Sequence, residues 1–397
     1  MDSWLSKQIA ALTNKTRWYW ITGVVVILLG LCASHYAAEE NFWVKPRRIV
    51  YKWLSDRLPI AERPIRCVLV LVDDDQYWLG EPAGRRPTKR DYLGRLISAT
   101  AVANPAVIAI DFILRSPSPD GNPIDHPEYK QETDALVKAV NDATASTCSV
   151  VLPRTMDLKD DGTFTIDSAV YDGHELSDRV YQGYINLPED DRRVPVNDVK
   201  ARDGRVLDSF AQAMLRADHV LISVTDAEGR LPFGRFAKLE AFERVLAGDV
   251  LCGHKRALRS LEHKIVIIGG YWHEEGLGCG DFIDMHDSPL GSVPGIVLHA
   301  NYAGNILQSH LYREWKENPS RILEIGTALF VGFVFALELG WWVKALAVIF
   351  VASFLVLASV FSIVLFALVF DFFIPVVMIA AHGVLAPFVE SRFHTPT

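Results

Sequence analysis

The chain has 397 residues, half of them hydrophobic, and carries a formal net charge of −8 at neutral pH. It is too apolar for an ordinary soluble protein, whereas its 22% of charged residues is too high for a bundle of membrane helices alone. The negative charge argues against nucleic acid as a partner, because phosphate binding requires a basic face. The length allows about two or three folding units.

The first apolar run begins at Trp18 and continues without a charged residue to Tyr36. A helix needs about 20 apolar residues to cross the hydrocarbon core of a bilayer. The run therefore predicts a transmembrane helix over 18–37, preceded by a tail of residues 1–17. The alternative is a cleaved signal peptide, whose apolar core is shorter, at about 7–15 residues.

A longer apolar region extends from Ile322 to Phe388 and exceeds what one membrane helix can hold. It is interrupted at 340–344 by a glycine, two tryptophans and a lysine, and at 371–375 by an aspartate and a proline. The region therefore predicts three more transmembrane helices, over 321–339, 342–365 and 371–389, followed by a tail of residues 390–397.

Basic residues beside the spans predict the orientation, because cytoplasmic loops carry an excess of lysine and arginine. Lys15 and Arg17 precede the first span, Lys344 lies between the second and third, and Arg392 follows the fourth. We therefore expect both termini in the cytoplasm, the spans in the lipid bilayer, and residues 38–319 outside.

The exported segment alternates short apolar runs with amphipathic stretches. Runs that are apolar throughout are typical of strands buried on both faces of a parallel sheet with crossover helices. We expect strands at 67–72, 106–110, 149–152, 219–224 and 264–268, and helices at 88–102, 132–140 and 298–315. The predicted fold is an α/β domain with a mainly parallel sheet, joined to a four-helix transmembrane region.

Five cysteines are present, and none belongs to a CxxC pair, which argues against a zinc knuckle or a thioredoxin-like site. Cys32 falls in the first predicted span. The other four allow disulfides without requiring them, and their spacing does not assign a pairing. These four are Cys67, Cys148, Cys252 and Cys279.

Acidic residues and glycines follow three of the predicted strands. Ligands of open α/β sheets usually bind beyond the carboxyl ends of the strands. Carboxylates there could bind a cationic or hydroxylated ligand or a divalent ion. The alternative is helix capping, since aspartate before a helix accepts backbone hydrogen bonds. The candidate ligand-binding residues are Asp73, Asp74, Asp75, Asp111, Gly269 and Gly270.

The segment 272–287 holds the densest cluster of potential metal ligands in the chain. We take His273, Glu275, Asp281 and His286 as the candidate ligands. Their spacing matches no standard zinc pattern, and a solvated acidic loop is the alternative interpretation. No organic cofactor is expected.

The order of the elements and several short motifs resemble the type-two CHASE domain, a sensory module found outside the membrane in bacterial receptors. The resemblance covers about residues 45–315. The matching motifs are 69–80, 87–90, 107–114, 116–120, 183–187, 208–211, 263–270, Asp281, Ser288-Pro289 and 294–301. Arg90, Asp281, His299 and Asn301 lie in the matching regions and join the candidate ligand-binding residues.

The resemblance implies a ligand sensor in the bacterial cytoplasmic membrane, with its main domain in the periplasm or extracellular space, and such sensors often act as homodimers. Family members commonly continue into a kinase or cyclase. Here only residues 390–397 follow the last predicted span, so we expect a separate membrane or cytoplasmic effector. The alternative is a structural or assembly subunit of a membrane complex that uses the exported domain to bind protein.

Sequence motifs do not favour an enzyme. The chain contains no GxSxG elbow, HExxH helix or Walker sequence. A glycoside-processing site with paired carboxylates is the strongest enzymatic alternative.

Overall fold

The computed structural model forms two compact units, Ile60–Leu311 and a second unit of residues 1–59 with 312–397. The residues that it describes are 66–115, 127–146, 148–159, 163–188, 194–196, 198–220, 234, 236–288, 290–307, 311, 313–314, 322, 326, 330, 341–366 and 368–369. Predicted spans 18–37 and 371–389 lie outside these residues.

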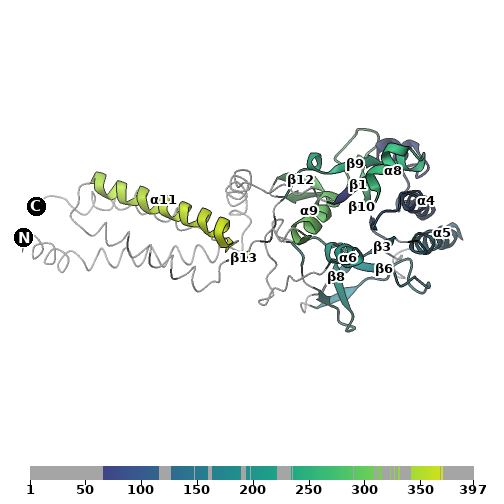
Figure 1. The fold of residues 1–397 in the computed structure, drawn as a ribbon, viewed down its shortest axis with the longest axis horizontal. Coiled ribbons are helices and arrows are strands. Elements are labelled where there is room, and N and C mark those ends of the chain that lie inside the picture. The colour runs from purple at the N-terminus through teal and green to yellow at the C-terminus, as the bar shows by residue number, and fades with distance from the viewer. Residues whose placement is uncertain are drawn as a thin grey trace, which may run out of the picture. The chain divides into compact units, whose positions relative to one another are not determined.

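An eight-stranded sheet forms the centre of the first unit (Figure 1). All of its pairings are parallel except that between β7 and β8. In spatial order the strands are β7 (Val199–Lys200), β8 (Val206–Ser209), β6 (Val180–Tyr184), β3 (Ser149–Arg154), β2 (Val107–Asp111), β10 (Ile265–Tyr271), β1 (Cys67–Asp73) and β9 (Glu243–Leu246). The mainly parallel α/β fold predicted from the sequence is confirmed.

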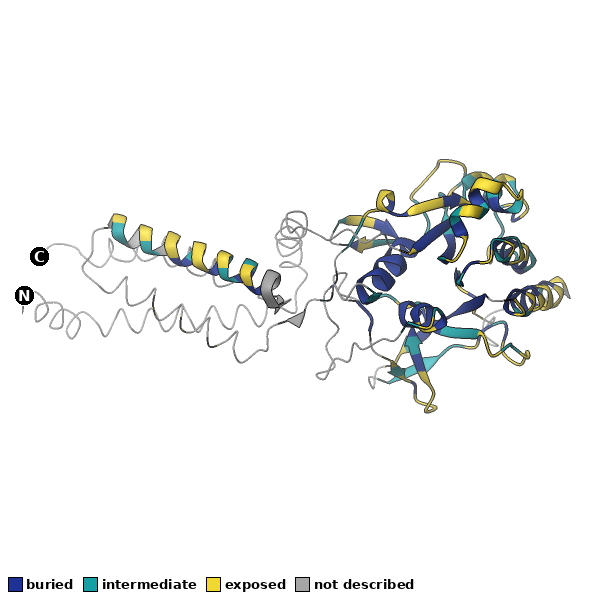
Figure 2. Ribbon diagram, viewed as in Figure 1, coloured by how far each residue is buried: buried dark blue, intermediate teal, exposed yellow. Residues whose placement is uncertain are grey.

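Alternate residues of the central strands face two separate hydrophobic cores, because successive side chains of a strand point to opposite faces. In β1, Val68 and Val70 pack in one core, whereas Leu69 and Leu71 pack in the other. Both faces are therefore covered by helices, which explains why these strands read as continuous apolar runs. Figure 2 shows the buried centre of the sheet.

The helices divide between the two faces. One core contains side chains of α4 (Arg90–Ala101), α5 (Pro127–Thr144), α7 (Ala247–Leu251) and α8 (Lys255–Leu261). The opposite core contains side chains of α6 (Phe210–Ala217) and α9 (Gly295–Leu307). Two short helices, the π-helix η2 (Asp75–Leu79) and the 3-10 helix η3 (Leu239–Ala241), follow β1 and precede β9.

Two of the predicted elements differ from the structure. The helix expected at 298–315 begins earlier and ends at Leu307, and Arg313–Glu314 form the short strand β13. The strand expected at 219–224 lies mostly outside the described residues. His219 and Val220 form a turn after α6, in which the Val220 amide donates to the Leu215 carbonyl.

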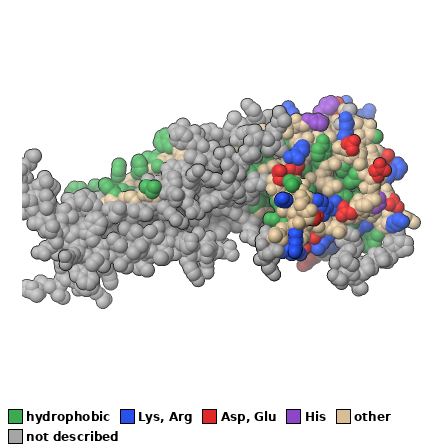
Figure 3. All heavy atoms as spheres, turned by 90° about the horizontal axis from the view of Figure 1, so that it is seen from below, with side chains coloured by type: hydrophobic (Ala, Val, Ile, Leu, Met, Phe, Trp, Pro, Cys, Tyr) green, Lys and Arg blue, Asp and Glu red, His purple; other side chains and the backbone are tan. Residues whose placement is uncertain are grey.

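Two small hairpins complete the first unit, β4 (Met156–Leu158) with β5 (Phe164–Ile166), and β11 (Met285–Ser288) with β12 (Gly291–Pro294). The four described cysteines are free, with Cys67 and Cys148 buried and Cys252 and Cys279 exposed. On the face drawn in Figure 3, basic and acidic side chains of this unit are interspersed.

In the second unit, the helix expected at 342–365 is present as α11 (Trp341–Phe366). It is followed by β14 (Leu368–Val369), which pairs with β13. Large apolar side chains are exposed along α11 (Figure 2), at Trp342, Leu346, Ile349, Phe350, Phe354, Leu357 and Phe361. Across the part of the chain that the structure describes, no helix meets the length and hydropathy required to span a membrane.

Candidate functional site

A pocket of about 720 Å³ opens beyond the carboxyl ends of the central parallel strands. Asp111 closes β2, Gly270 is near the end of β10, Thr155 follows β3 and Ile185 follows β6, and all four line it. Ligands of open α/β sheets bind at this edge. The volume falls within the range of about 300–1,000 Å³ that is usual for small-molecule sites.

Asp111 and His299 form a buried acidic corner of this pocket. The Asp111 Oδ1 and His299 Nε2 atoms are 3.6 Å apart, and their side chains are only 6% and 5% exposed. Asp111 points toward α9 because it follows Val107 and Ala109 on the face that packs against this helix. His299 Nδ1 is buried and has no hydrogen-bond partner among the described residues.

Burial controls the protonation of this pair, because a desolvated charge is costly. It raises the pKa of Asp111 well above its ordinary value, and the negative charge of Asp284 adds to the rise. Burial lowers the pKa of His299 to about 4, although Asp284 opposes that shift. Both groups therefore favour their neutral forms.

Asp284 and His286 extend the corner toward solvent, with Asp284 Oδ1 2.7 Å from His286 Nε2. Both residues line the pocket. Asp284 lies against the first residue of α9, because its carbonyl accepts from the Gly295 amide at 2.9 Å. A Cβ at Gly295 would clash with Asp284 Oδ2, so only glycine permits this approach.

Arg90 lines another part of the pocket and is 7% exposed. Its Nη1 donates to the Thr133 hydroxyl at 2.8 Å, and its guanidinium carbon is 5.1 Å from the centre of the Tyr129 ring. Burial lowers the pKa of Arg90, although the nearby charge of Glu132 opposes this. Among the described residues, no carboxylate lies within ion-pair distance of its guanidinium.

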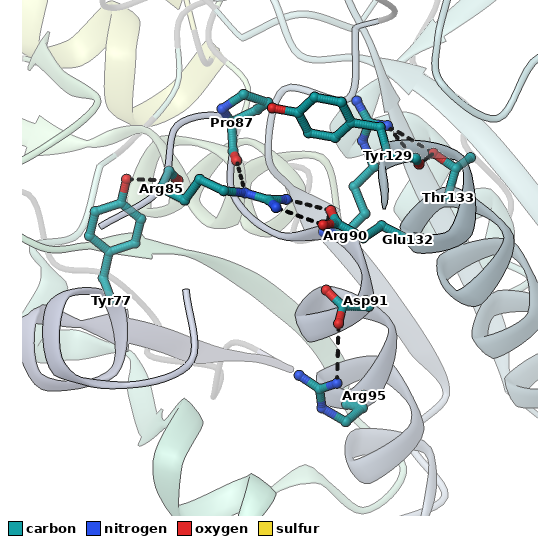
Figure 4. A network of polar contacts seen from close by, with 9 residues as sticks. All are labelled: Tyr77, Arg85, Pro87, Arg90, Asp91, Arg95, Tyr129, Glu132 and Thr133. Carbon is teal, nitrogen blue, oxygen red and sulfur yellow. Dashed lines mark hydrogen bonds and ion pairs between the residues drawn. The ribbon is translucent and has the colours of Figure 1, made fainter. Parts of the chain in front are cut away.

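Glu132 is the nearest acid to Arg90, but Arg85 occupies both of its oxygens (Figure 4). The Arg85 Nη1 atom donates to Glu132 Oε1 at 2.6 Å, and the Arg90 backbone amide donates to Glu132 Oε2 at 3.2 Å. Burial alone would raise the pKa of Glu132, but these hydrogen bonds and the two guanidinium charges lower it. Arg85 and Arg90 thus have one carboxylate between them, and the Arg85 guanidinium binds it directly.

An aromatic cluster forms a wall of the pocket. The Trp272 ring stacks on the Tyr77 ring, with centroids 3.9 Å apart. The centroids of the Phe112 and Trp272 rings are 6.1 Å apart. A Cβ at Gly270 would be 2.6 Å from Trp272 Cζ3, so this glycine makes room for the indole. The Trp272 Nε1 atom is buried without a hydrogen-bond partner among the described residues.

The three consecutive aspartates after β1 do not line the pocket. Asp73 Oδ1 accepts a hydrogen bond from the Gln76 amide at 3.0 Å. Such a bond from an aspartate to a backbone amide three residues later is the kind expected if the aspartate has a local structural role at the start of a helix. Asp74 accepts from the His273 amide at 2.7 Å and lies 2.6 Å from His273 Nδ1. Burial would raise the pKa of Asp74, but these hydrogen bonds lower it. Asp75 is exposed.

Gly269, Asp281 and Asn301 contribute to packing and backbone pairing instead. A Cβ at Gly269 would be 2.8 Å from Ile296 Cδ1 on α9. The Asp281 carbonyl accepts from the Glu274 amide at 2.9 Å. The Asn301 side chain bonds both the amide and the carbonyl of Ala237, at 2.6 and 3.0 Å.

The four candidate metal ligands do not come together. His273 pairs with Asp74 and His286 with Asp284, whereas Glu275 packs beside Gly280. Within the described ranges, no group of three or more His, Cys, Asp or Glu side chains has the arrangement of a metal site.

The structure thus brings Arg90, Asp111, Gly270, His299 and His286 to one pocket. The aromatic wall of Tyr77 and Trp272 was not predicted. A signal was present, since each of these aromatic residues lies in a polar segment shortly after a buried strand.

The chain thus folds into an α/β domain with a pocket at the carboxyl edge of its sheet. A family model, the CHASE2 domain, matches residues 16–336, so the chain belongs to the CHASE2 family of extracytoplasmic sensory domains. Neither the curated proteins nor the solved structures include a match to the chain.

Proposed function

We propose that this chain is a membrane-bound sensor that binds a small molecule in the pocket at the carboxyl edge of its sheet. The observation that carries the proposal is the convergence of Arg90, Asp111 and His299 on one cavity. Burying ionisable side chains costs free energy, because water stabilises their charged forms. Such groups in a cleft are characteristic of functional sites.

The pocket offers a physical route from ligand to signal through α9. Asp111 faces His299 on this helix, and Asp284 lies against its first residue, Gly295. In the sequence, α9 precedes the predicted span at 321–339 by a short segment. A ligand that contacts this corner differently in two arrangements of α9 would shift their populations.

We further propose that four helices, 18–37, 321–339, 342–365 and 371–389, anchor the chain in the bacterial cytoplasmic membrane. Their uncharged apolar runs support this. In addition, α11 presents large exposed apolar side chains, including Phe350 and Phe354. Such a face suits contact with lipid or with helices of an effector protein. Co-purification from native membranes would identify such an effector.

Ligand-induced stabilisation of the full-length chain in lipid nanodiscs tests the sensor proposal. A ligand at 100 times its Kd stabilises by about 2.7 kcal/mol, which raises the melting temperature. We expect at least one member of a broad metabolite panel to do so, and the Ile113→Trp variant to abolish the effect. Ile113 lines the pocket, is 67% exposed and can accept a larger side chain without disturbing the core.

Val102→Trp is the matched control, because Val102 is 75% exposed and lies outside the pocket. It should respond to the ligand as the unchanged chain does. If no metabolite stabilises the chain, or if Ile113→Trp responds normally, the pocket is not the sensory site.

A further inference from the structure

We propose that the pocket is built for a small apolar zwitterion, with an anionic group held by Arg90 and a protonated amine held by Asp111. This inference rests on the proposed function and names its ligand class. It follows from the distribution of charge around the cavity.

At the Arg90 side, the buried guanidinium has no carboxylate within ion-pair distance among the described residues. Arg85 and Arg90 share a single carboxylate, Glu132, and Arg85 takes both of its oxygens. The other two pocket arginines, Arg86 and Arg115, are exposed to solvent. Arg115 lies 3.4 Å from Asp167, and Arg86 donates to the Glu274 carbonyl at 2.9 Å. A buried guanidinium without an acid is suited to bind a carboxylate or phosphate group.

At the Asp111 side, the carboxyl group is buried, and its ionised form would have no charged partner among the described residues. The only basic group within ion-pair distance of Asp111 in the described structure is His299, at 3.6 Å, and its buried imidazole is neutral at ordinary pH. His286 pairs instead with Asp284, with 2.7 Å between His286 Nε2 and Asp284 Oδ1. A ligand ammonium would therefore supply the missing counter-charge, and His299 Nδ1, which has no partner among the described residues, offers a further hydrogen bond.

Much of the cavity lining is apolar. Leu93, Phe112, Leu114, Leu187, Trp272 and Ile283 line the cavity. A molecule with an anionic end, a cationic end and a hydrocarbon body could pair with Arg90 and with the ionised form of Asp111 at once. An anion would pair with Arg90 alone and a cation with Asp111 alone, so each would make one charged contact where a zwitterion makes two.

Paired ligands test this directly on the full-length chain in nanodiscs. The probes are ω-amino acids of increasing length (glycine, γ-aminobutyrate and ε-aminocaproate), together with L-leucine and L-phenylalanine. Caproate and n-hexylamine are the single-charge analogues of ε-aminocaproate. We expect the best zwitterion to bind about tenfold to a hundredfold more tightly than its own single-charge analogues, the range for one charged hydrogen-bonded contact.

Two variants test which residue binds each end of the ligand. Asp111→Asn, which keeps side-chain volume, should weaken the zwitterion by about tenfold or more and leave the carboxylate analogue unchanged. Arg90→Gln should weaken the zwitterion and leave the amine analogue unchanged. Asp142→Asn is the control, because Asp142 is an exposed acid on α5 that pairs with Lys138. Melting temperatures without ligand show whether each variant is folded, and the analogue comparison does not depend on any variant.

Calorimetry in buffers of different ionisation enthalpy gives an independent readout. Burial keeps Asp111 protonated to higher pH than usual, and its titratable neighbours are Asp284, His286 and His299. An ammonium paired with Asp111 favours the carboxylate, so binding should release a proton and strengthen as pH rises through the pKa of Asp111.

The outcomes separate this inference from the proposed function. If caproate binds as tightly as ε-aminocaproate and Asp111→Asn has no effect, the site takes anions and the inference is wrong. If n-hexylamine binds as tightly, it takes cations and the inference is equally wrong. If no zwitterion binds but another metabolite does, the sensor proposal stands and the zwitterion inference is wrong. If nothing binds, both proposals fail.

Discussion

The ion pair between Arg85 and Glu132 joins the loop before α4 to α5, with side chains that are 25% and 10% exposed. Removing one partner of a buried pair leaves the other charge without compensation. We predict that Glu132→Gln destabilises the chain by about 1–3 kcal/mol, less than a fully buried pair because Arg85 is partly solvated. Urea unfolding measures this. Asp142→Asn, in an exposed pair, should cost at most about 0.5 kcal/mol.

The same pair predicts a pH dependence. The pKa of Glu132 is lower in the folded chain than in the unfolded chain, so its stabilising effect is present above its unfolded value of about 4.3. The effect is lost as pH falls through the folded pKa. The stability difference between the unchanged chain and Glu132→Gln should therefore begin to shrink as pH falls below about 4.3, and it should vanish once pH is below the folded pKa of Glu132 in urea titrations. A constant difference would show that packing, not charge, is responsible.

Gly270 provides a steric test at the pocket wall. A Cβ there would be 2.6 Å from Trp272 Cζ3. We predict that Gly270→Ala destabilises by about 1–3 kcal/mol, the usual cost of overpacking. Combining it with Trp272→Leu should cost less than the sum of the two single changes, because the clash disappears. If the two destabilisations simply add, the cost of Gly270→Ala does not arise from a clash with Trp272.

Asp73, Asp74 and Asp111 occur in similar sequence patterns, but their side chains make different contacts in the structure. Asp73 accepts a hydrogen bond from the Gln76 amide in η2 and Asp74 binds the loop after β10, whereas Asp111 lines the pocket. Each follows a buried strand, so the local pattern is the same. The difference arises from which helix or loop faces the side chain across the sheet edge.

At the scale of elements, the loop between β10 and β11 depends on one distant side chain. Asp74 binds the amides of His273 and Gly278 and the His273 ring. We predict that Asp74→Ala increases amide hydrogen exchange across 272–283 by about tenfold or more, on the basis of about 1–3 kcal/mol for each lost charged bond. Asp75→Ala, an exposed neighbour, should leave the exchange unchanged. Equal exchange in both variants would mean that other contacts hold this loop.

Element boundaries were less predictable than element types. The helix α5 extends from Pro127 to Thr144, beyond the predicted 132–140, because its outer turns carry polar residues that mask the apolar spacing. The helix α9 ends at Leu307, whereas the predicted helix continued to residue 315. Helix ends depend on capping and on the contacts of the next segment, neither of which periodicity reports.

At the scale of the whole molecule, the exposed cysteines report the orientation of the domain. Cys252 and Cys279 are exposed, whereas Cys67 and Cys148 are buried. If residues 38–319 lie outside the cytoplasm, a membrane-impermeant maleimide should label the chain in intact spheroplasts. The Cys252→Ser/Cys279→Ser variant should lose this labelling. If labelling occurs only after the membranes are permeabilised, the domain lies on the cytoplasmic side and the proposed topology is wrong.

The parallel α/β domain and the carboxyl edge of its sheet can be read from the amino-acid sequence, because continuous apolar runs indicate strands buried on both faces. Asp111 and Gly270 are likewise recognisable as residues at that edge. The position of β10 between β1 and β2 and the packing of α9 beside them are apparent only in the folded chain. This order brings His299 to Asp111 and Trp272 to Tyr77. Contacts between distant segments depend on how the chain crosses the sheet, which no local pattern encodes.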